Sequence, residues 1–278
     1  MTGEAVRNPG AWPDLAKRAI SALVMAALAL GADWLGGWPF AAFWTVAAVV
    51  VLIEWEWIVL RRRLPIAIGA GAVIAASVLS AAGASLVAAG VVVVGALCVY
   101  VLRRPEPGRH LGAVGVVYAA AIAVPIILLR DDPALGPIAA LYLFAIVWGT
   151  DVMAYFVGRS VGGPKLWPAL SPKKTWSGFC GGVFFGTLAG ALVLWSAGLG
   201  VSLAAIVLSC LLAIVSQGGD LFESWLKRRY GAKDASHLIP GHGGLMDRLD
   251  GFVAAASIAF LIGLLRDPTA VASGLLVW

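Results

Sequence analysis

Polar side chains able to bind phosphate or a metal ion gather in the segment 216–251 of this 278-residue chain. Four of them are spaced i, i+3, i+4 and i+7, which places them on one face of a helix: Asp220, Glu223, Ser224 and Lys227. Asp247 and Asp250 stand about one turn apart at the start of the next apolar stretch. Carboxylates at two helix ends, beside several basic side chains, are typical of sites for Mg²⁺ and a polyphosphate. A salt-bridged loop without a metal is the alternative that this spacing leaves open.

Between these two groups lies the glycine-rich stretch PGHGG, Pro240–Gly244. Its flexible backbone could direct N–H groups at an oxyanion. His242 stands in the middle of it, and no second histidine lies at ligand spacing. We therefore expect His242 to donate a hydrogen bond to phosphate rather than to bind a metal.

A second polar segment precedes the first. Asp151, Tyr155 and Arg159 are spaced i, i+4 and i+8, so they form one stripe along a helix. An ionisable residue such as Asp151 at membrane depth is costly and usually has a function. The alternative is a structural link from Asp151 to Arg159 through the tyrosine.

The sequence SPKKT, Ser171–Thr175, follows this stripe and brings two ammonium groups and two hydroxyls to the expected helix start at Ser177. That combination suits phosphate. It is not a Walker A loop, because no glycine precedes the lysine. The alternative is that Lys173 and Lys174 only set the topology beside anionic headgroups.

The elements that must position these residues are membrane helices. Hydrophobic residues make up 61% of the chain and charged ones 13%, with a mean hydropathy of +0.92, whereas soluble proteins are about 25% charged. We expect an all-α polytopic membrane protein, because helices satisfy their own backbone groups in lipid. Nine windows are long enough to span: 19–38, 39–60, 64–82, 84–102, 111–129, 134–158, 177–199, 201–220 and 249–265.

The basic residues support this division. With nine spans, every Lys and Arg except Arg130 and Arg266 falls on one side, which the positive-inside rule assigns to the cytoplasm. The sequence thus predicts a cytoplasmic N-terminus and an integral plasma-membrane protein whose active site faces the cytoplasm. We expect one membrane domain, 1–278, in which residues 1–130 supply N-terminal helices and 131–278 carry the site. The same topology accounts for the net charge of +5.

Glycines at every fourth position, from Gly178 to Gly190, predict a ridge on which another helix packs closely. The three cysteines are isolated, which argues against a disulfide or zinc framework. The lack of HExxH, GxGxxG and GxSxG motifs argues against zinc protease, dinucleotide-binding and serine hydrolase functions.

The stretch from Ser224 to Asp250 reads S-x-L-K-R-x4-K-D-x-S-x2-I-P-G-H-G-G-L-x-D-R-L-D. It resembles the signature of the phosphatidate cytidylyltransferases, also called CDP-diacylglycerol synthases, without a departure. The stretches GDLxES, DxxAYxxGR and SPKKTxxGxxGG are similar to that family as well. The resemblance covers about the C-terminal half, and the N-terminal half matches only in hydropathy.

The resemblance implies transfer of CMP from CTP to phosphatidic acid, which gives CDP-diacylglycerol and pyrophosphate. It implies Mg²⁺ on Asp220 and Asp247, with a second cation for which a monovalent ion is a candidate. The catalytic residues would be Asp220, Ser224, Lys227, Arg228, Asp247 and Arg248. Substrate binding would fall to Asp151, Tyr155, Arg159, Ser171, Lys173, Lys174, Thr175, Lys233, Asp234, His242, Gly243, Gly244 and Asp250.

The expected partners are the two substrates and membrane lipids, with a homodimer as an alternative to a monomer and no nucleic acid. Two other functions stay open at this point. One is a CTP-dependent enzyme that acts on another lipid phosphate. The other is a membrane transporter, although transporters place their ionisable residues near mid-membrane on broken helices, and here those residues collect at the cytoplasmic ends.

Overall fold

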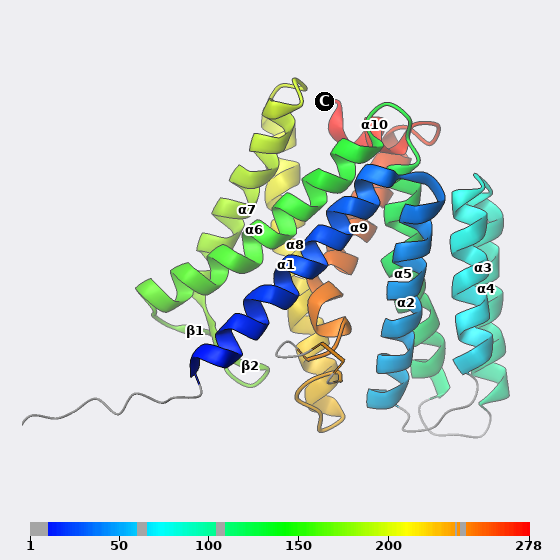
Figure 1. The fold of residues 1–278 in the computed structure, drawn as a ribbon, viewed down its shortest axis with the longest axis horizontal. Helices are drawn as coiled ribbons and strands as arrows, with labels where there is room; N and C mark the ends of the chain where they lie inside the picture. Colours follow the sequence, from blue (N-terminus) through cyan, green and yellow to red (C-terminus); the bar gives the residue numbers. More distant parts are fainter. Residues whose placement is uncertain (1–10, 60–65, 104–108, 237, 240–242) are drawn as a thin grey trace, which may run out of the picture.

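The computed structural model describes residues 11–59, 66–103, 109–236, 238–239 and 243–278. His242 therefore lies outside the described residues. Within them the chain forms nine long helices and a short C-terminal one (Figure 1). These are α1 Ala11–Leu35, α2 Gly37–Val59, α3 Ile66–Ala81, α4 Ser85–Leu102, α5 Arg109–Arg130, α6 Gly136–Val161, α7 Trp176–Ser196, α8 Leu203–Arg229, α9 Met246–Arg266 and α10 Val271–Leu276.

Consecutive long helices run in alternating directions, so the C-terminal ends of α6 and α8 and the loop between α6 and α7 lie toward the lower end of the bundle in Figure 1. In the described part, seven helices are long and apolar enough to cross a membrane, and Ile20–Leu35 and Ile66–Ala81 are shorter apolar helices. The all-α, polytopic membrane fold is thus confirmed. The count of nine spans and the orientation of the N-terminus stay predictions.

The long loop between α6 and α7 holds the two strands of the described part of the chain. Strands β1, Lys165–Trp167, and β2, Ser171–Thr175, pair antiparallel, with Lys165 opposite Thr175. The SPKKT sequence is therefore a strand that runs directly into α7. Thr175 is the N-cap residue, and its Oγ1 accepts a hydrogen bond from the Gly178 N–H at 3.1 Å.

The glycine ridge of α7 packs on α6, as its spacing predicts. Gly178, Gly182, Gly186 and Gly190 are all buried. A Cβ atom on Gly178 would lie 2.7 Å from the Ala154 carbonyl oxygen of α6, and one on Gly182 would lie 2.8 Å from that of Thr150. Only glycine allows these backbones to approach so closely. The ridge thus fixes the β1–β2 hairpin and the end of α6 relative to each other.

The bundle centre is aromatic. Trp44 of α2 stacks on Phe252 of α9, with ring centroids 4.7 Å apart, and Phe144 of α6 lies 5.6 Å from Phe252. All three side chains are buried. Such pairs stabilise beyond the area that they bury, and they join the N-terminal helices to α6 and α9.

At the opposite end, Asp132 holds the loop between α5 and α6 against the C-terminus. Its Oδ1 accepts hydrogen bonds from the N–H groups of Ala134 and Leu135, and its Oδ2 from the N–H and hydroxyl of Ser273. Burial alone would raise the pKa of Asp132, but these hydrogen bonds outweigh it and hold the pKa below its usual value.

Candidate active site

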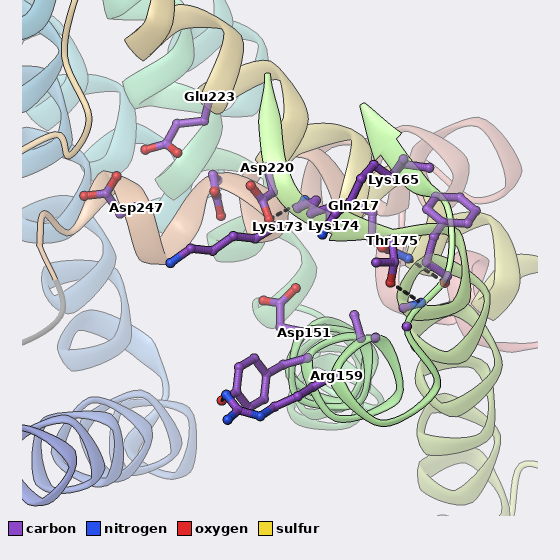
Figure 2. Close-up of a pocket in the computed structure, with 18 of the residues that line it drawn as sticks. Asp151, Arg159, Lys165, Lys173, Lys174, Thr175, Gln217, Asp220, Glu223 and Asp247 are labelled. Atoms are coloured by element: carbon purple, nitrogen blue, oxygen red, sulfur yellow. Dashed lines mark hydrogen bonds and ion pairs between the residues drawn. The ribbon is translucent and has the colours of Figure 1, made fainter. Parts of the chain in front are cut away.

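A cavity of about 720 Å³ opens at the basic end of the bundle, between α6, the β1–β2 hairpin, α8 and the start of α9 (Figure 2). Its size is within the range of small-molecule sites. Twelve residues predicted from the sequence line it: Asp151, Tyr155, Arg159, Lys173, Lys174, Thr175, Asp220, Lys227, Asp234, Asp247, Arg248 and Asp250. The two polar segments, far apart in the sequence, therefore meet at one site.

The hairpin is tied to α8 by an ion pair. The Nζ of Lys174 on β2 lies 2.5 Å from Oδ2 of Asp220 (Figure 2). Both side chains are partly exposed, 23% for Lys174 and 33% for Asp220. The Ser224 hydroxyl lies 3.4 Å from the other Asp220 oxygen, a long contact. Lys174 and Asp220 are thus accessible to an incoming anion and an incoming cation, respectively.

A second and more buried group joins α8 to α9. The Nζ of Lys227 lies 2.5 Å from both Oε2 of Glu223 and Oδ1 of Asp247. The side chains are 12% exposed for Lys227, 1% for Glu223 and 7% for Asp247. The other oxygen of Glu223 is buried without a hydrogen-bond partner among the described residues. One lysine therefore contacts two carboxylates, one from its own helix and one from α9.

Asp247 also accepts two backbone hydrogen bonds. Its Oδ2 receives the N–H of Ala235 at 3.0 Å and that of Gly244 at 2.8 Å. Gly243 has φ of +85°, and a Cβ there would lie 2.8 Å from the same Oδ2. The glycines were predicted to direct N–H groups at an oxyanion. In this structure the oxyanion that Gly244 binds is the carboxylate of Asp247.

The carboxylates of three helices face the same cavity. Asp151 of α6, Asp220 and Glu223 of α8 and the buried Asp250 of α9 all line it. Among the described residues, no three carboxylate, histidine or cysteine side chains are close enough to form a metal site by themselves. Mg²⁺ usually takes only one or two carboxylates, together with water and phosphate oxygens. The carboxylate oxygens of this cavity would therefore fit Mg²⁺ only together with ligands from water or a bound phosphate.

Basic side chains cover the hairpin side of the cavity. Lys165, Lys173 and Lys174 come from the two strands, and Arg159 comes from α6 (Figure 2). Nη1 of Arg159 donates to the Tyr155 hydroxyl at 3.2 Å. The predicted stripe on α6 thus exists, and its Tyr155–Arg159 contact forms. The cavity thus brings basic side chains of the hairpin and α6 together with carboxylates of α6, α8 and α9.

Some predicted residues are not in the lining. In the described part of the chain these are Ser171, Ser224, Arg228, Lys233, Gly243 and Gly244. Arg228 and Lys233 are exposed, whereas Gly243 and Gly244 pack against Asp247. The alternative of a salt-bridged loop agrees with part of this geometry, because each carboxylate predicted to bind the metal has a lysine partner. Lys174 pairs with Asp220, and Lys227 pairs with Asp247.

Among the polar side chains at the site, Lys165, Gln217 and Glu54 were missed, and Glu223 was placed on the polar helix face without a role. Lys165 and Gln217 line the cavity, and the Gln217 side-chain nitrogen donates to the Phe179 carbonyl oxygen at 3.0 Å. Glu223 shares the helix face of Asp220, a signal that was present in the spacing. Glu54 of α2 contacts the residues beside Asp247, and nothing in its local sequence indicates this.

The fold and the cavity define a polytopic membrane protein with a polar cavity lined by both basic and acidic side chains. Comparison with known proteins narrows this class. The chain matches the cytidylyltransferase family over residues 16–265 and belongs to it.

Relatives carry a more specific name. The chain is 40% identical to a phosphatidate cytidylyltransferase of Brucella abortus biovar 1 (strain 9-941) over 256 residues, which cover 90% of this chain and 93% of the relative. It is also 43% identical over 113 residues to the phosphatidate cytidylyltransferase of Bacillus subtilis (strain 168), covering 40% of this chain and 42% of that one. The family resemblance read from the motifs is thus confirmed, and it extends into the N-terminal half.

Proposed function

We propose that this protein transfers CMP from CTP to phosphatidic acid, which yields CDP-diacylglycerol and pyrophosphate in phospholipid biosynthesis. The observation that carries the proposal is the cavity in which the Lys174 side of the hairpin faces the carboxylates of α8 and α9. The nearly full-length relatives named phosphatidate cytidylyltransferase supply the reaction.

In this reaction a phosphate oxygen of phosphatidic acid attacks the α-phosphorus of CTP. A new P–O bond forms there, and the bond to the β-phosphate oxygen breaks and releases pyrophosphate. A phosphate monoester already carries between one and two negative charges at neutral pH, so a strong general base is not required. The barrier is electrostatic, because two anions must meet, and fixed cations lower it.

The basic side chains of the hairpin and α6 perform this neutralisation. Lys173, Lys174 and Arg159 bind phosphate oxygens on the open side of the cavity, where they are accessible. Lys227 and Arg248 are the cations on the side of α8 and α9. A lipid substrate explains the membrane fold, since the site lies at the ends of apolar helices and reaches both the headgroup layer and the aqueous nucleotide.

We propose Asp220 and Asp247 as the residues that would hold Mg²⁺. When bound, Mg²⁺ would neutralise charge on the phosphates of the nucleotide. The carboxylates that α8 and α9 contribute to the cavity support the assignment, as does the buried Glu223 oxygen without a partner among the described residues. The second cation, with a monovalent ion as candidate, stays part of the proposal, as does the homodimer.

The proposal places the cavity on the cytoplasmic side of the plasma membrane. Its test is labelling of single cysteines, in a background without the three native ones, by a reagent that does not cross membranes. Cysteines at Ser196 and Thr269, both exposed at the opposite end, should react in intact cells. A cysteine at the exposed Arg229 should react only after the membrane is opened, and external labelling there would contradict this orientation.

The reaction itself is tested with purified protein, CTP, Mg²⁺ and a panel of lipids, with products identified by mass spectrometry. The expected product is CDP-diacylglycerol from phosphatidic acid. Formation of a CDP-lipid only from a different lipid phosphate would show that this other lipid, and not phosphatidic acid, is the substrate. Binding without any nucleotidyl transfer would contradict an enzymatic function.

A further inference from the structure

Glu54 is a buried carboxylate in the N-terminal half that contacts the segment carrying Asp247. Its residue is 1% exposed, in the last turns of α2. Its Oε1 accepts hydrogen bonds from the Ser236 hydroxyl at 2.6 Å and the Leu245 N–H at 2.9 Å. Its Oε2 accepts the Met246 N–H at 2.6 Å. These three hydrogen bonds join positions 182 to 192 residues apart in the sequence.

The contact supplies what the sequence of α9 lacks. The N-cap residue of α9 is Leu245, which makes no side-chain cap hydrogen bond. The first N–H groups of a helix need acceptors, and a negative charge is favourable at that end. Glu54 satisfies both needs from another helix. A Cβ on the neighbouring Gly244 would lie 2.8 Å from Oε1 of Glu54, so the glycine allows the close approach.

Capping the start of α9 also fixes Asp247, which stands in its first turn. Glu54 binds the N–H groups of Leu245 and Met246, and Asp247 binds that of Gly244. Successive N–H groups of one short stretch are therefore divided between the two carboxylates. A shift of Glu54 would rotate this stretch and move the Asp247 carboxylate relative to Lys227.

We propose that Glu54 is a positioning residue for the cytidylyl transfer: it acts through the start of α9 to hold Asp247 at its place in the cavity. This inference rests on the function proposed above. It gives the N-terminal helices a role in the reaction, although the lining of the cavity comes from residues 151–250.

Glu56 offers a matched control two residues along the same helix. Its carboxylate is equally buried, with 2% of the side chain exposed, and it forms an ion pair with the buried Arg103 of the segment that follows α4. The hydrogen bonds to the start of α9 come from Glu54. Glu56→Gln therefore removes a buried charge of the same type without changing the cap of α9.

The test is a double-mutant cycle of Glu54→Gln and Asp247→Asn, with kcat for CDP-diacylglycerol formation measured per folded molecule. Gln keeps the size of Glu but turns one acceptor into a donor that faces backbone N–H groups. Since misplacement of a catalytic group by about 1 Å can cost about 100-fold, we expect Glu54→Gln to lower kcat by about 10- to 100-fold. In the Asp247→Asn background the same change should cost less than about twofold, because coupled residues are not additive.

Hydrogen exchange of the 244–248 backbone provides a measurement that does not depend on activity. Faster exchange there is expected in Glu54→Gln and not in Glu56→Gln. Additive losses in the cycle, or a normal kcat of Glu54→Gln per folded molecule, would overturn the proposal. If Glu54→Gln does not fold, Ser236→Ala removes one of the three donors and should give a smaller loss that is again coupled to Asp247. A wild-type protein that forms no CDP-lipid would refute the proposed function, and the exchange result would still decide whether Glu54 holds α9.

Discussion

Lys174→Met should separate a functional lysine from one that only supports the fold. The change removes an ammonium group 2.5 Å from Asp220 and keeps an apolar side chain of similar length. The two side chains are 23% and 33% exposed. Ion pairs in contact with water stabilise by about 0–1 kcal/mol. The melting temperature should therefore fall by no more than about 2–4 °C.

The expected effect on catalysis is larger. Lys174 faces the cavity from β2 and is proposed to bind a phosphate oxygen of CTP or of the lipid headgroup. A hydrogen bond to a charged group contributes about 1.5–3 kcal/mol. At about 1.4 kcal/mol for each factor of ten, kcat/KM should fall by about 10- to 150-fold.

The assay is CDP-diacylglycerol formation in mixed micelles at varied CTP and varied phosphatidic acid, beside the melting temperature of each variant. Arg229→Met is the control, because Arg229 is an exposed basic residue at the same end of the bundle, outside the cavity lining, over the ring of Trp225. Its kinetics should match the wild type. Unchanged kinetics in Lys174→Met, or a loss of activity that follows only the loss of folded protein, would refute the assignment of Lys174 to phosphate.

Three further predictions follow from the contacts. Asp247→Asn should lower kcat per folded molecule by about 100- to 1,000-fold, and an unstable enzyme with near-normal turnover would remove Asp247 from the metal site. Gly186→Ala adds a methyl group against α6 and should destabilise the folded protein by about 1–3 kcal/mol. Gly71→Ala meets open space and should not. Equal melting temperatures of the two variants would contradict the packing of α7 on α6. Asp132→Asn should lower the melting temperature at pH 7. Because the folded pKa of Asp132 is below the unfolded value of about 3.9, the difference in melting temperature between wild type and variant should shrink as the pH falls through the folded pKa. A difference that stays constant when Tm is measured against pH would argue against the Ser273 contact.

The membrane fold and half of the site could be read from the sequence because they depend on local periodicity. The spacing from Asp220 to Lys227 fixes a helix face whatever the rest of the chain does. Glycines at every fourth position similarly predict a close helix contact, and α6 is the helix that meets them. Long apolar windows leave few alternatives to a helix in lipid.

Contacts between distant segments were beyond such patterns. Lys174 lies in a strand, and its pairing with Asp220 depends on how the hairpin folds over α8. The acceptor of the α9 N–H groups is Glu54, 191 residues before Leu245. In sequence, Glu54 is one of two acids in an apolar helix, and nothing distinguishes it from Glu56. Only the packing of α2 beside the start of α9 shows what it binds.

The central claim is that the cytidylyl group, and not a terminal phosphate, moves from CTP to a lipid phosphate. Purified protein in lipid nanodiscs with phosphatidic acid, Mg²⁺ and CTP labelled either at the α- or at the γ-phosphorus tests it directly. The account predicts that the α-label enters the lipid fraction and the γ-label leaves as pyrophosphate. Label from the γ-position in the lipid, or no lipid label from either position, would contradict it.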